Sequence, residues 1–286
     1  MTITITTSNV NGIRAAKRKG IEQWAAKNTP DVWCMQEVRA PQNEIDPIFD
    51  EFGFEYATAG RIADQSGLDR MNEICRIKGR AGVGLLSALP VIDKRYGLPG
   101  LAEDVDSGRW IEADVKTPQG YTVTVVCVYV HAGNTDDPEK MKQKYRFLDT
   151  MLVRMGQLRD EAAHGGKQAV LCGDFNIAHT PLDIKNAKAN EKHAGFLSEE
   201  RAYVDKWLGE LEFVDVMRSL CGDIQGPYTW WSQRGRAFDN NVGWRIDYQF
   251  ATPELAETAR GFVIDKAPTY DLRWSDHAPL SITYDV

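Results

Sequence analysis

Short β-rich runs recur along the whole chain, and this recurrence constrains the fold more than any other feature of the sequence. Eight runs have this character: Thr2–Thr7, Asp31–Gln36, Gly82–Ser87, Arg109–Val115, Tyr121–Val130, Gln168–Cys172, Arg245–Ala251 and Pro279–Tyr284. Thr2–Thr7 alternates as a strand with one buried face does, whereas Tyr121–Val130 is nearly continuously apolar, as a strand buried on both faces is. Strands of both kinds predict sheets that pack against one another.

Three helical patterns lie between these runs. The longest extends from Pro138 to about Ala163, and proline suits the first turn of a helix. Its apolar face is formed by Met141, Tyr145, Leu148, Leu152, Met155 and Leu158. A second helix begins at Ser198, a residue type that caps helices, and a third covers Arg14–Lys27. Strands mixed with a few helices predict an α/β fold with the helices outside the sheets.

The chain contains no segment that reads as a linker between domains. Its 286 residues would allow one large domain or two small ones. Because no linker divides it and no period repeats, we expect a single domain over residues 1–286. The polar stretch Gly60–Gly79 is expected to form a long surface loop, and loops of that length are usually functional or mobile.

Composition narrows the class of protein. The chain has 34 Lys and Arg against 41 Asp and Glu, a net charge of −7 that, taken alone, argues against general binding to nucleic acid. Five cysteines without a Cys-x-x-Cys pair indicate reduced thiols and a cytoplasmic protein. The longest apolar run, Val123–Val130, is far shorter than the ~20 residues of a membrane-spanning helix. We therefore expect no membrane association.

Polar residues at strand ends carry the chemistry. The strand Gln168–Cys172 runs into Gly173-Asp174-Phe175-Asn176, which projects a carboxylate and a carboxamide on one side. An Asx turn would explain this segment alone. The pattern recurs, however, at four further places: Asn9 with Asn11, Gln36 with Glu37, Asp247, and Asp276 with His277. Five such positions predict an oxygen-rich site with one imidazole.

This set of groups suits a hard cation such as Mg²⁺ or Mn²⁺ better than zinc, because only one histidine belongs to it. A hard cation with Asn, His and Asp around it is suited to the attack of water on a phosphate ester. The sequence has no Gly-rich phosphate loop and no Gly-x-Ser-x-Gly, which argues against a kinase, an ATPase or a serine esterase.

The motifs resemble, in order, those of the endonuclease/exonuclease/phosphatase superfamily, and most closely its exonuclease III type abasic-site DNA endonucleases. They are residues 8–14, 36–37, 128–130, 173–180, 228–232, 241–248 and 275–280. The block Asn-Val-Gly-Trp-Arg-Ile-Asp-Tyr at 241–248 is typical of the DNA-repair branch. The resemblance implies a four-layer, DNase I-like sandwich of two mixed sheets with helices outside, and a site at one edge of the sheets.

The resemblance also implies roles for individual residues. Glu37, with Asn9 nearby, would hold the divalent metal, and Asp276 would lie next to the metal or the leaving group. Asp174 would orient and deprotonate the attacking water, and Asn176 would hold the water or the phosphate. The expected cofactor is Mg²⁺, with Mn²⁺ as an alternative.

Three further side chains complete the implied catalytic set. His277, held by Asp247, would bond the phosphoryl oxygen and stabilise the developing charge. Tyr129 would position the phosphate or the leaving oxygen. By contrast, His179 and Asp183 are interpreted as local hydrogen-bonding residues. The remaining histidines are interpreted as structural or solvated: His131, His164 and His193.

The substrate implied by the resemblance is double-stranded DNA with abasic sites or 3′ ends. Trp230, Trp244 and Ile246 map onto an apolar pocket for a sugar that lacks its base, which flips out of the duplex at little cost. The expected backbone contacts come from Asn11, Arg14, Lys17, Arg18, Lys19, Arg39, Lys140, Lys142, Lys144, Arg234, Arg236 and Arg245. Because these cations are few, general affinity for DNA should be weak and salt-sensitive.

The leading hypothesis is a Mg²⁺-dependent monomeric enzyme that incises DNA 5′ to abasic sites and has 3′-to-5′ exonuclease activity. One alternative is a phosphatase or phosphodiesterase of the same superfamily that acts on a phosphoester other than DNA. Such an enzyme would not need the pocket of Trp230, Trp244 and Ile246. A non-catalytic DNA-damage binding protein is the third reading, and the intact Glu37 and Asp174 weigh against it.

Overall fold

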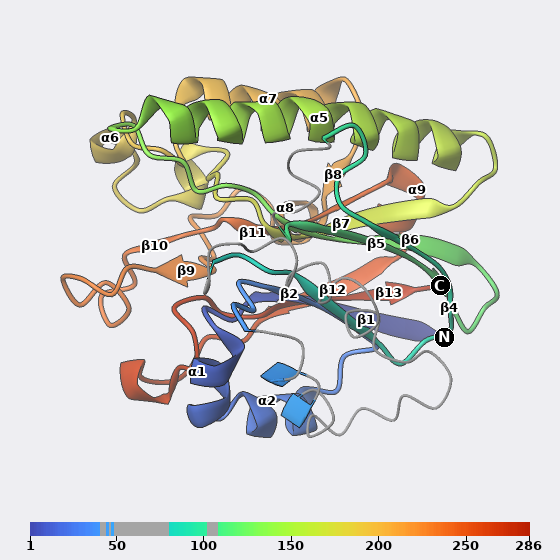
Figure 1. The fold of residues 1–286 in the computed structure, drawn as a ribbon, viewed down its shortest axis with the longest axis horizontal. Helices are drawn as coiled ribbons and strands as arrows, with labels where there is room; N and C mark the ends of the chain where they lie inside the picture. The colour runs from blue at the N-terminus through green and yellow to red at the C-terminus, as the bar shows by residue number, and fades with distance from the viewer. Residues whose placement is uncertain (41–43, 46, 49–79, 102–107) are drawn as a thin grey trace.

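Two β-sheets packed face to face form the centre of the molecule in the computed structural model (Figure 1). The structure describes residues 1–40, 44–45, 47–48, 80–101 and 108–286. The loop expected at Gly60–Gly79 lies outside the described residues.

The first sheet has five strands in the order β12-β13-β1-β2-β3. Their bounds are β1 (Thr2–Asn9), β2 (Val32–Gln36), β3 (Gly84–Ser87), β12 (Ala259–Ile264) and β13 (Leu280–Asp285). Strands β1 and β2 are parallel, and the other neighbours are antiparallel. The sheet is therefore mixed, as the sequence predicts.

The second sheet has six strands in the order β4-β5-β6-β7-β11-β8. Their bounds are β4 (Val91–Tyr96), β5 (Trp110–Lys116), β6 (Thr122–Tyr129), β7 (Gln168–Asp174), β8 (Val214–Asp215) and β11 (Asp247–Ala251). Strands β6 and β7 are parallel in an otherwise antiparallel sheet. A core of aliphatic residues, including Ile5, Cys34, Val125 and Ile282, fills the space between the two sheets.

Helices cover the outer face of each sheet, which gives four layers (Figure 1). The long helix α5 (Pro138–Ala163) and α7 (Ser198–Gly209) pack on the six-stranded sheet. Helices α1 (Ile13–Arg18) and α2 (Ile21–Asn28) pack on the five-stranded sheet. Shorter elements join the layers: α6 (Ala187–Asn190), α8 (Val216–Cys221), α9 (Pro253–Ala256), the 3-10 turns Pro181–Asp183 and Tyr270–Leu272, and the ribbon β9 (Trp230–Trp231) with β10 (Gly243–Trp244). The predicted four-layer architecture is confirmed.

All eight predicted strands are present, with ends that differ by a few residues. The helix predicted at Arg14–Lys27 is wrong in one respect, because two helices occupy the segment. The chain leaves α1 at Lys19 and restarts at Gly20, whose φ of 94° lies in the left-handed region that favours glycine. Ser198 is the first residue of α7 and not its N-cap.

The cysteines of the described residues are free, and three of them belong to the core between the sheets. Cys34, Cys127 and Cys172 are free and buried between the sheets, and burial raises the pKa of the Cys34 and Cys127 thiols. In the ranges that the structure describes, no helix is both long enough and apolar enough to cross a membrane.

The two parallel strand pairs position the functional groups. Strands β1 and β2 end at Asn9 and Gln36, and β6 and β7 end at Tyr129 and Asp174. Asn9 bonds to Asp174 across the two sheets, so all four ends meet at one edge of the sandwich. Both chain termini lie at the opposite edge (Figure 1).

Candidate active site

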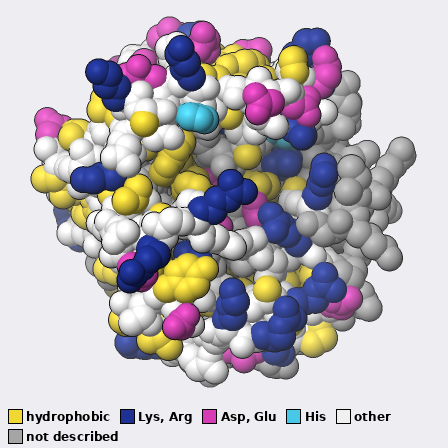
Figure 2. Space-filling view, turned by 90° about the vertical axis from the view of Figure 1, so that its left-hand side faces the viewer, with side chains coloured by type: hydrophobic (Ala, Val, Ile, Leu, Met, Phe, Trp, Pro, Cys, Tyr) yellow, Lys and Arg dark blue, Asp and Glu magenta, His cyan; other side chains and the backbone are white. Residues whose placement is uncertain are grey.

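A cavity of about 450 Å³ opens at this edge, and polar groups line one end of it while apolar groups line the other. Figure 2 shows the corresponding face, where Lys and Arg side chains surround a hollow. Nearly all the catalytic and pocket residues predicted from the sequence line the cavity: Asn11, Glu37, Arg39, Tyr129, Asp174, Asn176, Trp230, Trp244, Ile246, Asp276 and His277. Residues from seven separate segments thus meet at one place.

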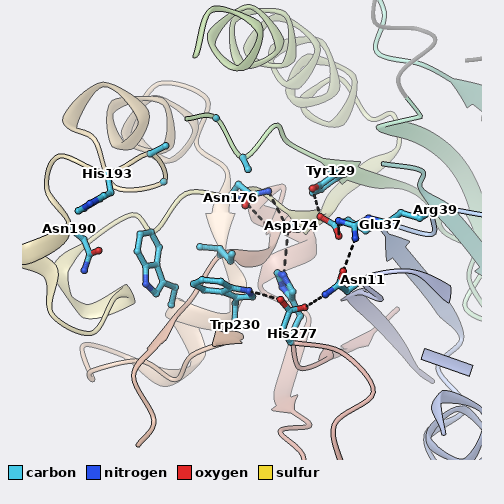
Figure 3. Close-up of a pocket in the computed structure, with 17 residues that line it drawn as sticks. Asn11, Glu37, Arg39, Tyr129, Asp174, Asn176, Asn190, His193, Trp230 and His277 are labelled. Carbon is cyan, nitrogen blue, oxygen red and sulfur yellow. Dashed lines mark hydrogen bonds and ion pairs between the residues drawn. The ribbon is translucent and has the colours of Figure 1, made fainter. Parts of the chain in front are cut away.

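A buried histidine between two carboxylates forms the deepest part of the site. Asp247 lies opposite Asp174 in the antiparallel pairing of β11 with β7. His277, just before β13, places Nδ1 2.9 Å from Asp247 Oδ2 and Nε2 3.8 Å from Asp174 Oδ2. All three side chains are buried. One nitrogen of the imidazole is therefore fixed by Asp247. The other is directed toward Asp174 (Figure 3).

The charges of this group shift its pKa values. Burial raises the pKa of Asp174 to about 7, although His277 opposes the shift. Burial disfavours the imidazolium form of His277, but the adjacent Asp247 carboxylate outweighs burial and raises its pKa to about 10. His277 is accordingly a cation at neutral pH, and Asp174 is poised to take up a proton there.

Asp174 is held by two amides. Asn9 donates from Nδ2 to Asp174 Oδ2 at 2.9 Å, and the Asn176 backbone N–H donates to Oδ1 at 2.9 Å. The Asn176 side chain donates to Val130 O at 3.0 Å, which fixes its own orientation. The amide of Asn9 also accepts from the Asn11 backbone N–H and does not line the cavity. The side chain of Asn9 thus contacts Asp174, while its backbone pairs with Gln36, the residue before Glu37.

Glu37 lies between a phenol and a guanidinium at the polar end of the cavity. Tyr129 donates its hydroxyl to Glu37 Oε1, and Arg39 forms an ion pair with Oε2. Burial and the nearby Glu37 and Asp174 carboxylates raise the pKa of Tyr129, so its hydroxyl stays protonated. Glu37 and Arg39 have φ values of 54° and 52°, and such left-handed non-glycine residues are often found at functional sites.

A chain of hydrogen bonds continues from Arg39 along the rim. Arg39 Nη1 donates to Asn11 Oδ1, and Asn11 Nδ2 donates to Asp276 Oδ1, each at 2.8 Å. Trp230 donates from Nε1 to Asp276 Oδ2 at 3.2 Å. Burial raises the pKa of Asp276, but His277 and these donors outweigh it and lower the pKa overall. Asp276 is therefore an anion that ties the polar end to the apolar end.

The chemistry of the donor set fits a divalent metal ion. Glu37, Asp174 and Asp276 all bring carboxylates to one cavity, and Asp174, Asp247 and His277 have ligand atoms within 4.8 Å of one another. Asp247 Oδ1 is buried without a hydrogen-bond partner among the residues that the structure describes. Carboxylate oxygens are preferred ligands of hard cations. The site thus has the surplus of negative charge that a bound cation would balance.

The apolar end is formed by two indoles and an isoleucine. The rings of Trp230 and Trp244 meet almost at a right angle, with centroids 6.0 Å apart. Ile246 packs beside them against Ile184 and Phe196. These three residues form the wall that the sequence predicts, next to the catalytic group and not in the core between the sheets.

Two predicted DNA-contacting cations are wrong. Arg245 is 0% exposed and pairs with Asp183 and Asp215, and Lys144 is 0% exposed and pairs with Glu200. The sequence predicts DNA contacts for both because they lie next to motif loops. Each side chain instead neutralises a buried carboxylate, a pairing that joins segments far apart in the sequence. Asp183 accepts the predicted local hydrogen bonds from Thr180, but it also accepts from the distant Arg218 and Arg245.

The other predicted cations are at the surface or on the rim. Arg14 is about half exposed and pairs with Glu44, and Lys17 pairs with Glu22. Arg234 and Arg236 are exposed in the segment between β9 and β10. These side chains can reach an anionic ligand without leaving a buried partner.

Sequence reasoning missed part of the cavity wall. His193, interpreted as structural or solvated, lines the cavity together with Asn190, Ala194 and Gly195 (Figure 3). Their loop carries no apolar period and follows no predicted strand. It reaches the site through tertiary contacts of Gly195, whose carbonyl accepts from the Ala178 N–H and where an added Cβ would lie 3.0 Å from Trp244 and 3.1 Å from Asn176. No local signal marks such a residue.

Comparisons with known proteins agree with this geometry. The chain is 29% identical over 279 residues to an exodeoxyribonuclease of Bacillus subtilis (strain 168), which covers 97% of this chain and 98% of the relative. It is 30% identical over 278 residues to a DNA-(apurinic or apyrimidinic site) endonuclease of Dictyostelium discoideum, covering 97% of this chain and 69% of the relative.

Solved structures are similar over almost the whole chain. An AP endonuclease from Archaeoglobus fulgidus matches with a TM-score of 0.75 and 31% identity, covering 99% of this chain and 100% of that one. The 3′ phosphatase NExo from Neisseria, bound to a product DNA hairpin, matches with a TM-score of 0.76, 26% identity and the same coverage. The model of the Endonuclease/Exonuclease/phosphatase family matches residues 6–277, and the chain belongs to that family.

Proposed function

We propose that this chain is a divalent-cation-dependent DNA phosphodiesterase that cuts 5′ to abasic sites and also shortens DNA from 3′ ends. One observation carries the proposal: a single cavity joins the buried group of Asp174, His277 and Asp247 to an apolar wall of Trp230, Trp244 and Ile246. The first part is suited to phosphoryl chemistry and the second to a sugar without its base.

The chain's own residues account for the proton and charge movements. Asp174, with its pKa raised to about 7, takes a proton from a water molecule directed at the phosphorus. His277 is held as a cation by Asp247 and donates a hydrogen bond to a non-bridging phosphoryl oxygen, where negative charge develops. Tyr129, kept protonated, orients the phosphate from the other side of the cavity, and Asn176 holds the water.

Glu37 and Asp276 would hold the metal ion, for which we propose Mg²⁺, with Mn²⁺ as a functional replacement. When bound, the cation supplies Lewis-acid stabilisation of the phosphate and the leaving oxygen. The assignment is supported by the two carboxylates that line the same cavity, where Asn11 donates to Asp276. Asn9 would act by fixing Asp174.

The substrate would be double-stranded DNA, and Arg14, Lys17 and Arg39 beside the cavity would bind its backbone phosphates. Because the net charge of the chain is −7, the affinity for undamaged duplex should be weak and should fall steeply as the salt concentration rises. The DNA-acting relatives support this choice of polymer. We also propose a monomer with one catalytic domain over residues 1–286, and the family model, which matches residues 6–277, supports the single domain.

A duplex with one abasic analogue tests the proposal directly. We expect cleavage 5′ to the analogue with Mg²⁺, none with a chelator, and slower shortening of the intact duplex. Glu37→Gln should abolish cleavage and leave thermal unfolding unchanged. Glu139→Gln, the same change on the exposed face of α5, should have no effect.

Other outcomes would support different readings. Release of phosphate from a 3′-phosphorylated primer without abasic cleavage would favour a phosphatase of the same family. Tight binding of the abasic duplex without cleavage under any metal would favour a damage-binding protein. Full activity of Glu37→Gln would refute the metal assignment.

A further inference from the structure

Arg245 occupies an unusual place in the chain, between two residues of the apolar wall. Trp244 and Ile246 line the cavity, whereas Arg245 is completely buried on the side away from it. Successive side chains of an extended segment point to opposite sides. The direction of the Arg245 side chain is therefore coupled to the direction of both wall residues.

Both the side chain and the backbone of Arg245 are fixed. Its Nε donates to Asp183 Oδ1 at 2.7 Å, and Nη1 forms an ion pair with Asp215 Oδ2 at 2.7 Å, without hydrogen-bond geometry. The guanidinium lies over the Tyr248 ring, 4.4 Å from its centroid. The backbone N–H of Arg245 donates to Asp183 O at 2.7 Å, and its carbonyl accepts from the Tyr248 hydroxyl at 3.1 Å.

A second arginine completes this group and extends it to the strand that carries Trp230. Arg218 Nη2 donates to Asp183 Oδ1 at 2.5 Å, and its Nη atoms also donate to the carbonyls of Gly222, Ile224 and Gly226. That segment leads directly into β9. We call Asp183, Asp215, Arg218 and Arg245 the Arg245 cluster. Its two cations and two anions balance, so the cluster is a structural anchor and not a ligand site.

The wall that the cluster supports has little room to move. Trp244 packs closely enough against Gly195 that an added Cβ there would lie 3.0 Å from the indole ring. Trp230 meets Trp244 on its other side, and its Nε1 is bonded to Asp276. An apolar pocket discriminates by size only while its walls keep their positions, and a displacement of about 1 Å can reduce a rate by about 100-fold.

We propose that Arg245 is a specificity-determining positioning residue. By anchoring the chain between Trp244 and Ile246, it keeps the apolar wall close enough to hold a sugar without a base and to exclude an intact nucleotide. The inference rests on the proposed function, because it assigns the anchor of the pocket that selects the abasic site. Arg245 touches neither the cavity nor DNA, so it acts only through its two neighbours.

Arg245→Lys tests this inference, since it keeps the charge but loses the forked contacts to Asp183 and Asp215. We expect kcat/KM on the abasic duplex to fall about tenfold or more, mainly through KM. The ratio of abasic cleavage to shortening of intact duplex should fall by a similar factor. Hydrolysis of bis(p-nitrophenyl) phosphate, which is too small to need the wall, should stay within about twofold.

Two further variants keep the test decisive. Arg260→Lys, the same substitution in an exposed pair with Asp285, should change none of the three rates. Asp215→Asn removes one partner of Arg245 but leaves Asp183 and Arg218 paired, and it should lower the same ratio even if Arg245→Lys fails to fold. An unchanged ratio in a folded variant of the cluster would overturn the inference. If the unsubstituted protein does not cleave the abasic duplex, the proposed function fails instead.

Discussion

Two buried groups of charges lie close together in this molecule and differ in their charge balance. In the first, Lys144 pairs with Glu200 at 2.5 Å, and both side chains are fully buried. Lys144 also donates to the carbonyls of Ala132 and Asn176, while Glu200 accepts from the backbone N–H groups of Gly195 and Leu197. Each charge of this pair therefore lies next to an opposite charge and also makes hydrogen bonds to the backbone.

The group of Asp174, Asp247 and His277 at the candidate active site is not balanced in this way. Asp174 and Asp247 share a single cation, His277, and Asp247 Oδ1 lacks a hydrogen-bond partner within the described ranges. Burial of two carboxylates beside one imidazolium leaves negative charge that a metal ion or a proton would neutralise. The comparison shows that every charge of the Lys144–Glu200 pair is compensated, whereas the group at the cavity keeps a surplus of negative charge among the described residues.

The largest effect should follow when the unbalanced group loses a charge. Asp174→Asn should reduce the incision rate by at least about 1,000-fold, because the proton acceptor is gone. The free energy of unfolding should change by less than about 1 kcal/mol, since repulsion from Asp247 is removed together with the charge. Single-turnover incision and urea unfolding measure the two quantities. Asp223→Asn, at an exposed position, serves as the control.

The opposite result is expected in the balanced pair. Lys144→Met leaves Glu200 buried without its cation, and the free energy of unfolding should fall by about 3–5 kcal/mol. The additional change Glu200→Gln should recover part of the loss, because no charge then remains buried. Urea unfolding of the single and double variants tests this. A loss below about 1 kcal/mol in Lys144→Met would show that balance is not what the pair contributes.

The sequence predicts the strands and the main helix because period and turn residues are local signals. The α5 bounds at Pro138 and Ala163 agree with the prediction, since the apolar stripe and the N-terminal proline are both local. The edge strand β4 (Val91–Tyr96) was missed, because an edge strand is half exposed and carries charged residues such as Asp93 and Lys94.

The residues of the candidate site likewise divide into those that a local sequence pattern identifies and those that it does not. Carboxylates at strand ends are visible in the sequence, because an apolar run that stops at Asp174 or Glu37 is a local pattern. Arg245 and Lys144 could not be placed, because their burial depends on acids that are distant in the chain. His193 was missed for the same reason: it reaches the cavity through tertiary packing alone. Residues that act through distant partners need the structure.

Acid should weaken the Arg245 cluster in a definite range of pH. Burial raises the pKa of Asp183, but Arg245 and Arg218 outweigh it and lower the pKa from 3.8 to about 2. When folding lowers the pKa of a carboxyl group, the group stabilises the folded protein at any pH above its pKa in the unfolded chain. This stabilisation is lost as the pH falls toward the pKa of the group in the folded protein. The contribution, about 2 kcal/mol, should therefore persist down to about pH 4 and decline between pH 4 and pH 2.

The measurement is urea unfolding of the unsubstituted protein and of Asp183→Asn at pH 6, 4 and 3. The difference between the two should be constant from pH 6 to pH 4 and smaller by about 1 kcal/mol at pH 3. A difference that instead declined between pH 6 and pH 4 would mean that Asp183 does not have a lowered pKa. The two arginines would then not compensate the charge of Asp183 in the Arg245 cluster.

The smallest effect should be found where charges pair outside the protein interior. Lys142 and Glu139 lie on the solvent face of α5, 2.7 Å apart, and their side chains are 72% and 75% exposed. Water and salt screen such a pair, so Lys142→Ala should change the free energy of unfolding by less than about 0.5 kcal/mol. Lys142 and Glu139 lie on the same helix as Lys144, so local backbone structure is shared. A loss comparable to that of Lys144→Met would therefore trace the contribution of Lys144 to the helix itself and not to the burial of a balanced charge.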